Sequence, residues 1–253
     1  MHAIKLAVTA ISRQAARPSG PASMLKAYRY SSLQMLSTKA SPCCDRVKAT
    51  SHSHQNCWNC GKTNDCCVFF CASCNHIQPL HANGACNYFK IFGIPENFSI
   101  DPKAVEQLYW SLQKKMHPDL YGSKSQTEKE LSVVNSAVIN TAYNMLKAPT
   151  TRANYLLHLH GIDALSDNTT YMDPAILMHI MECREQVDDC TTLEELAPLK
   201  KENANDIERC VVQITSAFDG SHDLETSKRL TVQLQYLMKL AEAIVEKEEA
   251  LEG

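Results

Sequence analysis

The sequence predicts a mainly α-helical protein that contains, in chain order, a small cysteine-rich segment, an antiparallel helical hairpin and a three-helix bundle. Three observations support this prediction. Two Cys-x-x-Cys pairs have matched spacing, two amphipathic stretches flank His117-Pro118-Asp119, and three more apolar stripes at helical spacing follow residue 173. Such helices are stable when their apolar faces bury one another. At 253 residues, the chain is long enough for two modest cores.

Residues 1–40 have the composition of a mitochondrial transit peptide, and residues 41–56 are expected to be a linker. No acidic residue occurs before Asp45, whereas six Lys and Arg side chains are spread through Ala- and Ser-rich sequence. Removing residues 1–40 would change the formal net charge from −3 to −9, because these six positive charges leave. A basic disordered tail is the alternative. We expect the mature protein in the mitochondrial matrix.

Charge and hydropathy argue against two classes of partner. A formal net charge of −3 and a pI near 6.4 give no general electrostatic reason to bind nucleic acid. The longest apolar run, around residues 66–72, is far shorter than the roughly 20 residues that a membrane-spanning helix needs. We therefore expect a soluble protein that binds neither nucleic acid nor a membrane.

The two Cys-x-x-Cys pairs predict a structural zinc site within residues 57–80. The expected ligands are Cys57, Cys60, Cys71 and Cys74. Zinc prefers four tetrahedral thiolates, and two such turns supply them. Four protein ligands leave no position for water or substrate, so the expected role of the metal is structural.

Other side chains near these pairs leave the ligand set open. The residues that could replace a ligand are Cys66, Cys67, His52, His54, His76 and His81. A disulfide-exchanging redox motif is a rival hypothesis, since single Cys-x-x-Cys motifs do this chemistry. The matched spacing of two pairs favours zinc.

The first hairpin helix is expected to begin after Asp101, which can cap it, and to end near Met116. Pro102 suits the first helical position, where its missing N–H costs nothing. Pro118 disfavours helical geometry at His117 and so ends the helix. The apolar stripe of this helix comprises Val105, Leu108, Tyr109, Leu112 and Met116.

The second hairpin helix is expected after Ser125, which forms a capping box with Glu128. Its predicted stripe comprises Leu131, Val134, Val138, Ala142 and Met145. If the two stripes bury each other, residues 117–119 lie at the exposed tip of an antiparallel pair.

The tip offers an imidazole, a rigid ring and a carboxylate in the order His117, Pro118, Asp119. An acid-base site would need a nucleophile or a pocket, and the surrounding sequence supplies neither. Recognition fits better. Asp119 can accept a bidentate arginine from a partner, and Lys114 and Lys115 extend the surface with positive charge.

Residues 173–251 predict a three-helix bundle whose first helix is capped by Asp173 and Pro174. The core stripes comprise Ile176, Ile180, Cys183 and Val187; Ile207, Val211, Ile214 and Phe218; and Leu230, Leu234, Leu237, Ala241 and Ile244. Pro198 is expected to kink or delay the middle helix. On the first and last of these helices, Leu177, Met178, Met181 and Tyr236 lie outside the core stripes.

Several segments resemble the HscB family, the J-type co-chaperones of iron-sulfur cluster biogenesis. They are "NYFKIFGIP", "KKMHPD", "SKSQTEKE", "NTAYNMLKAPTTRANYLLHLHGI" and "ILMHIMECREQVDD". The resemblance covers roughly residues 86–251, and the double Cys-x-x-Cys is typical of animal mitochondrial members. It implies a J-domain over 86–149, a connector over 150–172 and a scaffold-binding domain over 173–251.

The resemblance also implies the function of a co-chaperone without catalysis of its own. The tip would dock on a mitochondrial seventy-kilodalton heat-shock chaperone and stimulate its ATPase. The four residues outside the stripes would bind the iron-sulfur cluster scaffold protein, although packing against the hairpin or residues 151–160 would equally explain them. A general co-chaperone for unfolded clients and a zinc or redox module remain alternatives, and a homodimer stays open.

Overall fold

The computed structural model describes residues 54–80, 86–164 and 173–253. The expected transit peptide and nearly all of the expected linker lie outside this part of the chain. The mainly helical fold class is confirmed, with one two-stranded antiparallel sheet, β1 (His54–Asn56) and β2 (Thr63–Asp65), in the cysteine-rich segment. In the described ranges no helix is long and apolar enough to cross a membrane.

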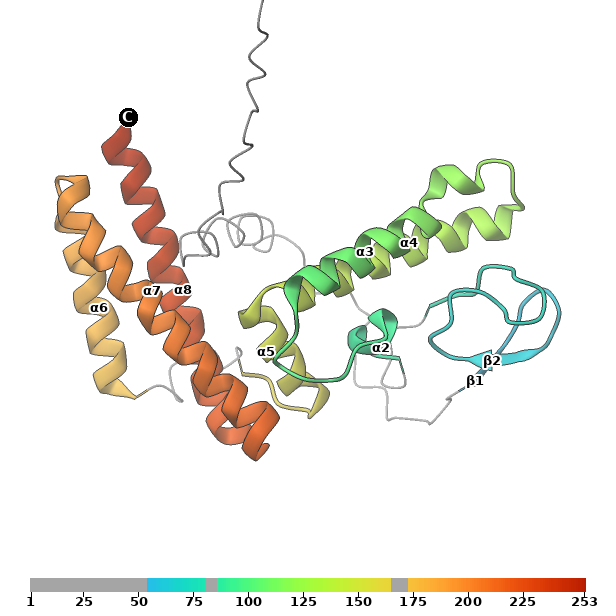
Figure 1. Ribbon diagram of the computed structural model, residues 1–253, viewed down its shortest axis with the longest axis horizontal. Coiled ribbons are helices and arrows are strands. Elements are labelled where there is room, and N and C mark those ends of the chain that lie inside the picture. The colour runs from blue at the N-terminus through green and yellow to red at the C-terminus, as the bar shows by residue number, and fades with distance from the viewer. Residues whose placement is uncertain (1–53, 81–85, 165–172) are drawn as a thin grey trace, which may run out of the picture.

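The hairpin consists of α3 (Pro102–Met116) and α4 (Gln126–Lys147), which run antiparallel (Figure 1). Their predicted boundaries are confirmed. The Asp101 side chain accepts from the amide of Lys103, and Ser125 forms the predicted capping box with Glu128. The short α2 (Tyr88–Phe92) precedes the hairpin and ends at Gly93, whose φ of 65° is left-handed and therefore suits glycine.

The predicted stripe of α4 is wrong in part, because Val134 is exposed. The buried face instead comprises Ser132, Asn135, Ile139, Ala142 and Leu146. This helix packs against α2, α5 (Pro149–Leu159) and the cysteine-rich segment as well as α3, so its core face is displaced from the hairpin seam. Asn135 can be buried because its side chain accepts from the amide of Leu80 and donates to the carbonyl of Gln78.

The bundle consists of α6 (Pro174–Asp189), α7 (Leu193–Thr215) and α8 (Leu224–Glu252), with the π-helical turn η3 (Ser216–Ser221) between the last two. The predicted core of α8 is confirmed, since all five of its stripe residues are buried. Pro198 does not delay α7, which starts five residues earlier at a Thr192–Glu195 capping box. The cap fixes the start of the helix locally and outweighs the hydrogen bond that proline cannot donate.

Phe98, in the loop between α2 and α3, connects the hairpin to the bundle. Its side chain is 1% exposed and stacks on Phe218 of η3, with ring centroids 5.9 Å apart. Its amide donates to Asp219 Oδ1 at 2.8 Å, and its carbonyl accepts from Arg152 Nε at 2.8 Å. We call this arrangement the Phe98 junction. Together with the packing of α5 on α8, it places the hairpin relative to the bundle, and Figure 1 shows the resulting arrangement.

We predict that Asp219→Ala destabilises the chain by about 1–2 kcal/mol, since two amides, of Phe98 and Ser99, lose their carboxylate acceptor. The measurement is the free energy of unfolding in urea. Glu208→Ala, an exposed acid on α7, is the control and should change stability by less than about 0.5 kcal/mol. Equal stabilities of the Asp219 variant and the wild type would argue against the junction.

Candidate docking surfaces and metal site

The tip of the hairpin exposes His117 and Asp119. Their side chains are 56% and 88% exposed, and His117 Nδ1 lies 3.4 Å from Asp119 Oδ2. Pro118 prevents α3 from continuing past His117, and it begins a separate 3-10 turn, η2 (Pro118–Tyr121). The buried Tyr121 anchors this turn, because its hydroxyl donates to the carbonyl of Lys115 at 3.2 Å. His117, Pro118 and Asp119 are therefore held in a fixed arrangement at the surface.

The surface beside the tip combines positive charge with apolar area. Lys114 and Lys115 are exposed in the last turn of α3, as predicted. The structure adds Leu120 and Trp110, which are among the exposed large hydrophobic residues of the described chain. Sequence reasoning missed both. Trp110 falls outside the apolar stripe of its helix, and this position could have identified it as an exposed aromatic residue.

The second predicted surface lies on α6 of the bundle, where Met178 and Met181 are 63% and 58% exposed. Packing against the hairpin or α5 therefore does not account for these two side chains. Leu177 and Tyr236 are half-buried and pack against the main core. Of the four predicted residues, Met178 and Met181 are thus exposed, whereas Leu177 and Tyr236 are half-buried.

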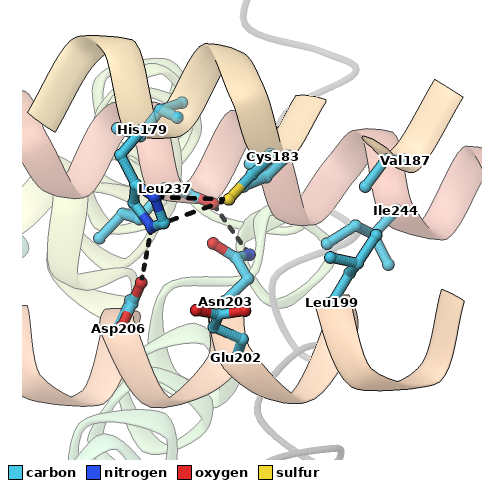
Figure 2. Close-up of a pocket in the computed structure, with 11 residues that line it drawn as sticks. His179, Cys183, Val187, Leu199, Glu202, Asn203, Asp206, Leu237 and Ile244 are labelled. Carbon is cyan, nitrogen blue, oxygen red and sulfur yellow. Dashed lines mark hydrogen bonds and ion pairs between the residues drawn. The ribbon is translucent and has the colours of Figure 1, made fainter. Parts of the chain in front are cut away.

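Other residues of α6 turn inward and line a small pocket against α7 and α8 (Figure 2). His179 Nε2 lies 3.9 Å from Asp206 Oδ2 and 3.7 Å from Cys183 Sγ. A cysteine beside a histidine can be a nucleophile, but only as the thiolate. Burial raises the pKa of Cys183, with Glu202 and Glu182 adding to the effect, so the thiol stays protonated. This pocket is a packing seam between α6, α7 and α8.

The cysteine-rich segment brings all four predicted ligands together. The Sγ atoms of Cys57, Cys60, Cys71 and Cys74 lie within 4.8 Å of one another. The Sγ separations are 3.6 Å for Cys57 and Cys74 and 3.7 Å for Cys60 and Cys71. A tetrahedral zinc ion with Zn–S bonds of about 2.3 Å requires S–S edges of about 3.8 Å. The cluster fits zinc.

The two cysteine turns have the same backbone geometry. Gly61 and Asn75 follow the two pairs at positive φ, and their amides donate to the carbonyls of Cys57 and Cys71, respectively, both at 2.9 Å. In each turn the amide two residues after the first cysteine points at its sulfur, at 3.4 Å. Amides directed at sulfur stabilise thiolates, which are the form that binds metal.

The electrostatics of the cluster favour a bound cation. The backbone amides of Cys74 and Ser73 lower the pKa of Cys71 to about 6. The amide of Lys62 acts to lower the pKa of Cys60, yet burial and the neighbouring thiols raise it to about 11. Four adjacent thiolates would repel one another, and a divalent cation between them would offset this repulsion.

The alternative ligands do not join this cluster within the described residues. His76 Nδ1 lies 3.3 Å from Asn59 Nδ2 and 3.0 Å from the carbonyl oxygen of Cys74, and His54 is exposed. His52 and His81 lie outside the described residues. Cys67 forms a disulfide with Cys86, which lies two residues before the first residue of α2.

Comparison with known proteins agrees with two parts of the fold, the helical hairpin and the C-terminal bundle. A family model for the DnaJ domain matches residues 87–155, and a model for the HSCB C-terminal oligomerisation domain matches residues 172–245. The chain superposes on the crystal structure of human co-chaperone protein HscB with a TM-score of 0.70 and 30% identity, covering 78% of this chain and 100% of that one. The corresponding TM-score for chaperone HscB from Vibrio cholerae is 0.59, at 30% identity, covering 66% and 99%.

Curated proteins give the same result. The chain is 31% identical over 197 residues to the iron-sulfur cluster co-chaperone protein HscB homolog of Arabidopsis thaliana, covering 78% of this chain and 76% of that protein. It is 30% identical over 213 residues to the iron-sulfur cluster co-chaperone protein HscB of Homo sapiens, covering 79% and 86%. With its J-domain hairpin and C-terminal bundle, the chain belongs to the HscB family of iron-sulfur cluster co-chaperones.

Proposed function

We propose that this protein binds the iron-sulfur cluster scaffold protein and delivers it to a mitochondrial seventy-kilodalton heat-shock chaperone, whose ATPase it stimulates. The observation that most directly supports the proposal is the placement of two exposed surfaces of different chemistry on one chain. The tip at His117 to Asp119 lies at the end of the hairpin away from the bundle, and Met178 and Met181 lie on α6 (Figure 1).

The tip acts by binding rather than by chemistry. Asp119 can accept a bidentate arginine from the chaperone, while Lys114 and Lys115 contact acidic groups beside it. A bound protein changes its partner's equilibrium only through different affinities for the partner's states. The tip therefore stimulates hydrolysis by binding most tightly to the state of the chaperone that is competent to hydrolyse ATP. The ATPase groups belong to the chaperone.

The α6 surface holds the scaffold through a few apolar anchors. Exposed methionine side chains adapt to the shape of a partner and gain burial on binding. Leu177, which precedes Met178 in α6, and Tyr236 of α8 are half-buried and would complete the contact. A co-chaperone for unfolded clients would use the same tip, but it would not require this surface on the bundle. The scaffold is therefore the favoured client.

Zinc is the proposed metal of the four-cysteine site, where its role is structural. Cys57, Cys60, Cys71 and Cys74 would hold it and complete its shell, so the ion would hold the two turns together. The basic composition of residues 1–40 supports delivery to the mitochondrial matrix.

We predict that His117→Gln lowers the stimulated ATPase rate of the chaperone to nearly its basal value, because the tip loses the imidazole that orders it. The measurement is steady-state ATP hydrolysis by the purified chaperone. His158→Gln, an exposed histidine on α5, is the matched control and should stimulate fully. Full stimulation by the His117 variant would refute the role of the tip.

We predict that Met178→Ala with Met181→Ala weakens scaffold binding by about 2 kcal/mol, roughly thirtyfold in Kd, while stability is unchanged because both side chains are exposed. Calorimetric titration with the scaffold measures the effect. Val212→Ala removes a similarly exposed apolar side chain from α7 and should leave the Kd unchanged. An unaltered Kd for the methionine variant would place the scaffold elsewhere.

A further inference from the structure

A second group of sulfurs lies outside the four-cysteine site. It consists of Cys66 and Cys67, in the loop between the two cysteine turns, and Cys86, immediately before α2. The three Sγ atoms lie within 4.8 Å of one another, and Cys66 Sγ is 3.5 Å from Cys67 Sγ. Residues distant in sequence, on two separate parts of the fold, are therefore brought to one point.

The surroundings of this group are those of a built site. Cys86 is fully buried, while Cys66 and Cys67 are half-buried and pack against the main core. The disulfide between Cys67 and Cys86 joins the cysteine-rich segment to the start of the J-domain. Cys66 brings a third sulfur to the same point, and three sulfurs this close together can hold a metal ion.

We propose that the reduced form of Cys66, Cys67 and Cys86 is a metal site for a soft monovalent cation of the Cu⁺ type. Thiolates select soft ions, and this group offers three sulfurs. No fourth His, Cys, Asp or Glu side chain joins the group within residues 54–80, 86–164 and 173–253. Three sulfurs complete a trigonal shell around Cu⁺, whereas zinc would need a fourth ligand.

Access to the site depends on the redox state of one bond. A dithiol reductant of the thioredoxin class supplies two electrons and two protons to the Cys67–Cys86 disulfide and becomes a disulfide itself. The products are two protein thiols. Each thiol that then binds the cation as a thiolate releases its proton. The metal and the disulfide are alternative links between the cysteine-rich segment and the J-domain.

The test uses the full chain carrying zinc, kept anaerobic and reduced, and titrated with Cu⁺ in competition with a chromogenic chelator. Metal content is measured by mass spectrometry for copper and zinc together. The wild type should bind one Cu⁺ per chain and retain its zinc. Cys66→Ser should lose that equivalent, and Cys183→Ser, a half-buried cysteine of α6, should keep it.

Two further samples make the result decisive. Cys67→Ser should lose the copper equivalent, and so should wild type oxidised to the disulfide, which peptide mapping verifies. The proposal is overturned if reduced wild type binds no added copper, if copper displaces zinc, if a second zinc occupies the site, or if Cys66→Ser binds copper as the wild type does.

Discussion

The architecture depends on the Phe98 junction. One residue of the loop before α3 uses its ring, its amide and its carbonyl to contact Phe218, Asp219 and Arg152, respectively. Arg152 is itself buried and donates a second hydrogen bond to the carbonyl of Leu146 at the end of α4. A buried guanidinium is tolerated where its donors are satisfied. The junction and the packing of α5 on α8 together set the distance and direction between the hairpin tip and the bundle.

The hairpin tip and the α6 surface differ in chemistry, as their proposed roles require. The tip is small, polar and held by backbone geometry, which suits selective contact with one state of a partner. The α6 surface is apolar and made of adaptable side chains, which suits affinity for a client. Asn135 holds the cysteine-rich segment on α4 through two hydrogen bonds, so the four-cysteine site lies beside the hairpin.

Local signals predicted the helix boundaries well, because these caps depend on residues two or three positions apart. Asp101, Ser125 and Asp173 all cap helices as expected. The burial of Ser132 and Asn135 could not be predicted, since the partners of Asn135 are Gln78 and Leu80, 55 or more residues away.

Features of the sites that depend on contacts between residues far apart in the sequence could not be predicted either. The grouping of Cys57, Cys60, Cys71 and Cys74 followed from spacing alone, but the approach of Cys86 to Cys67 depends on how the cysteine-rich segment docks on the J-domain. The same applies to the Phe98 junction, whose two hydrogen-bonded residues are 121 positions apart. Leu177 and Tyr236 fell outside the predicted stripes, yet their half-burial depends on neighbouring elements that periodicity does not reveal.

The central claim is that one chain must present both surfaces at once. The most direct measurement is the scaffold-dependent ATPase rate of the chaperone with an equimolar mixture of two full-length variants, one altered at His117 and the other at Met178 and Met181. Each variant retains the surface that the other lacks. The account predicts that the mixture is no more active than the methionine variant alone. Recovery of the wild-type rate by the mixture would contradict it.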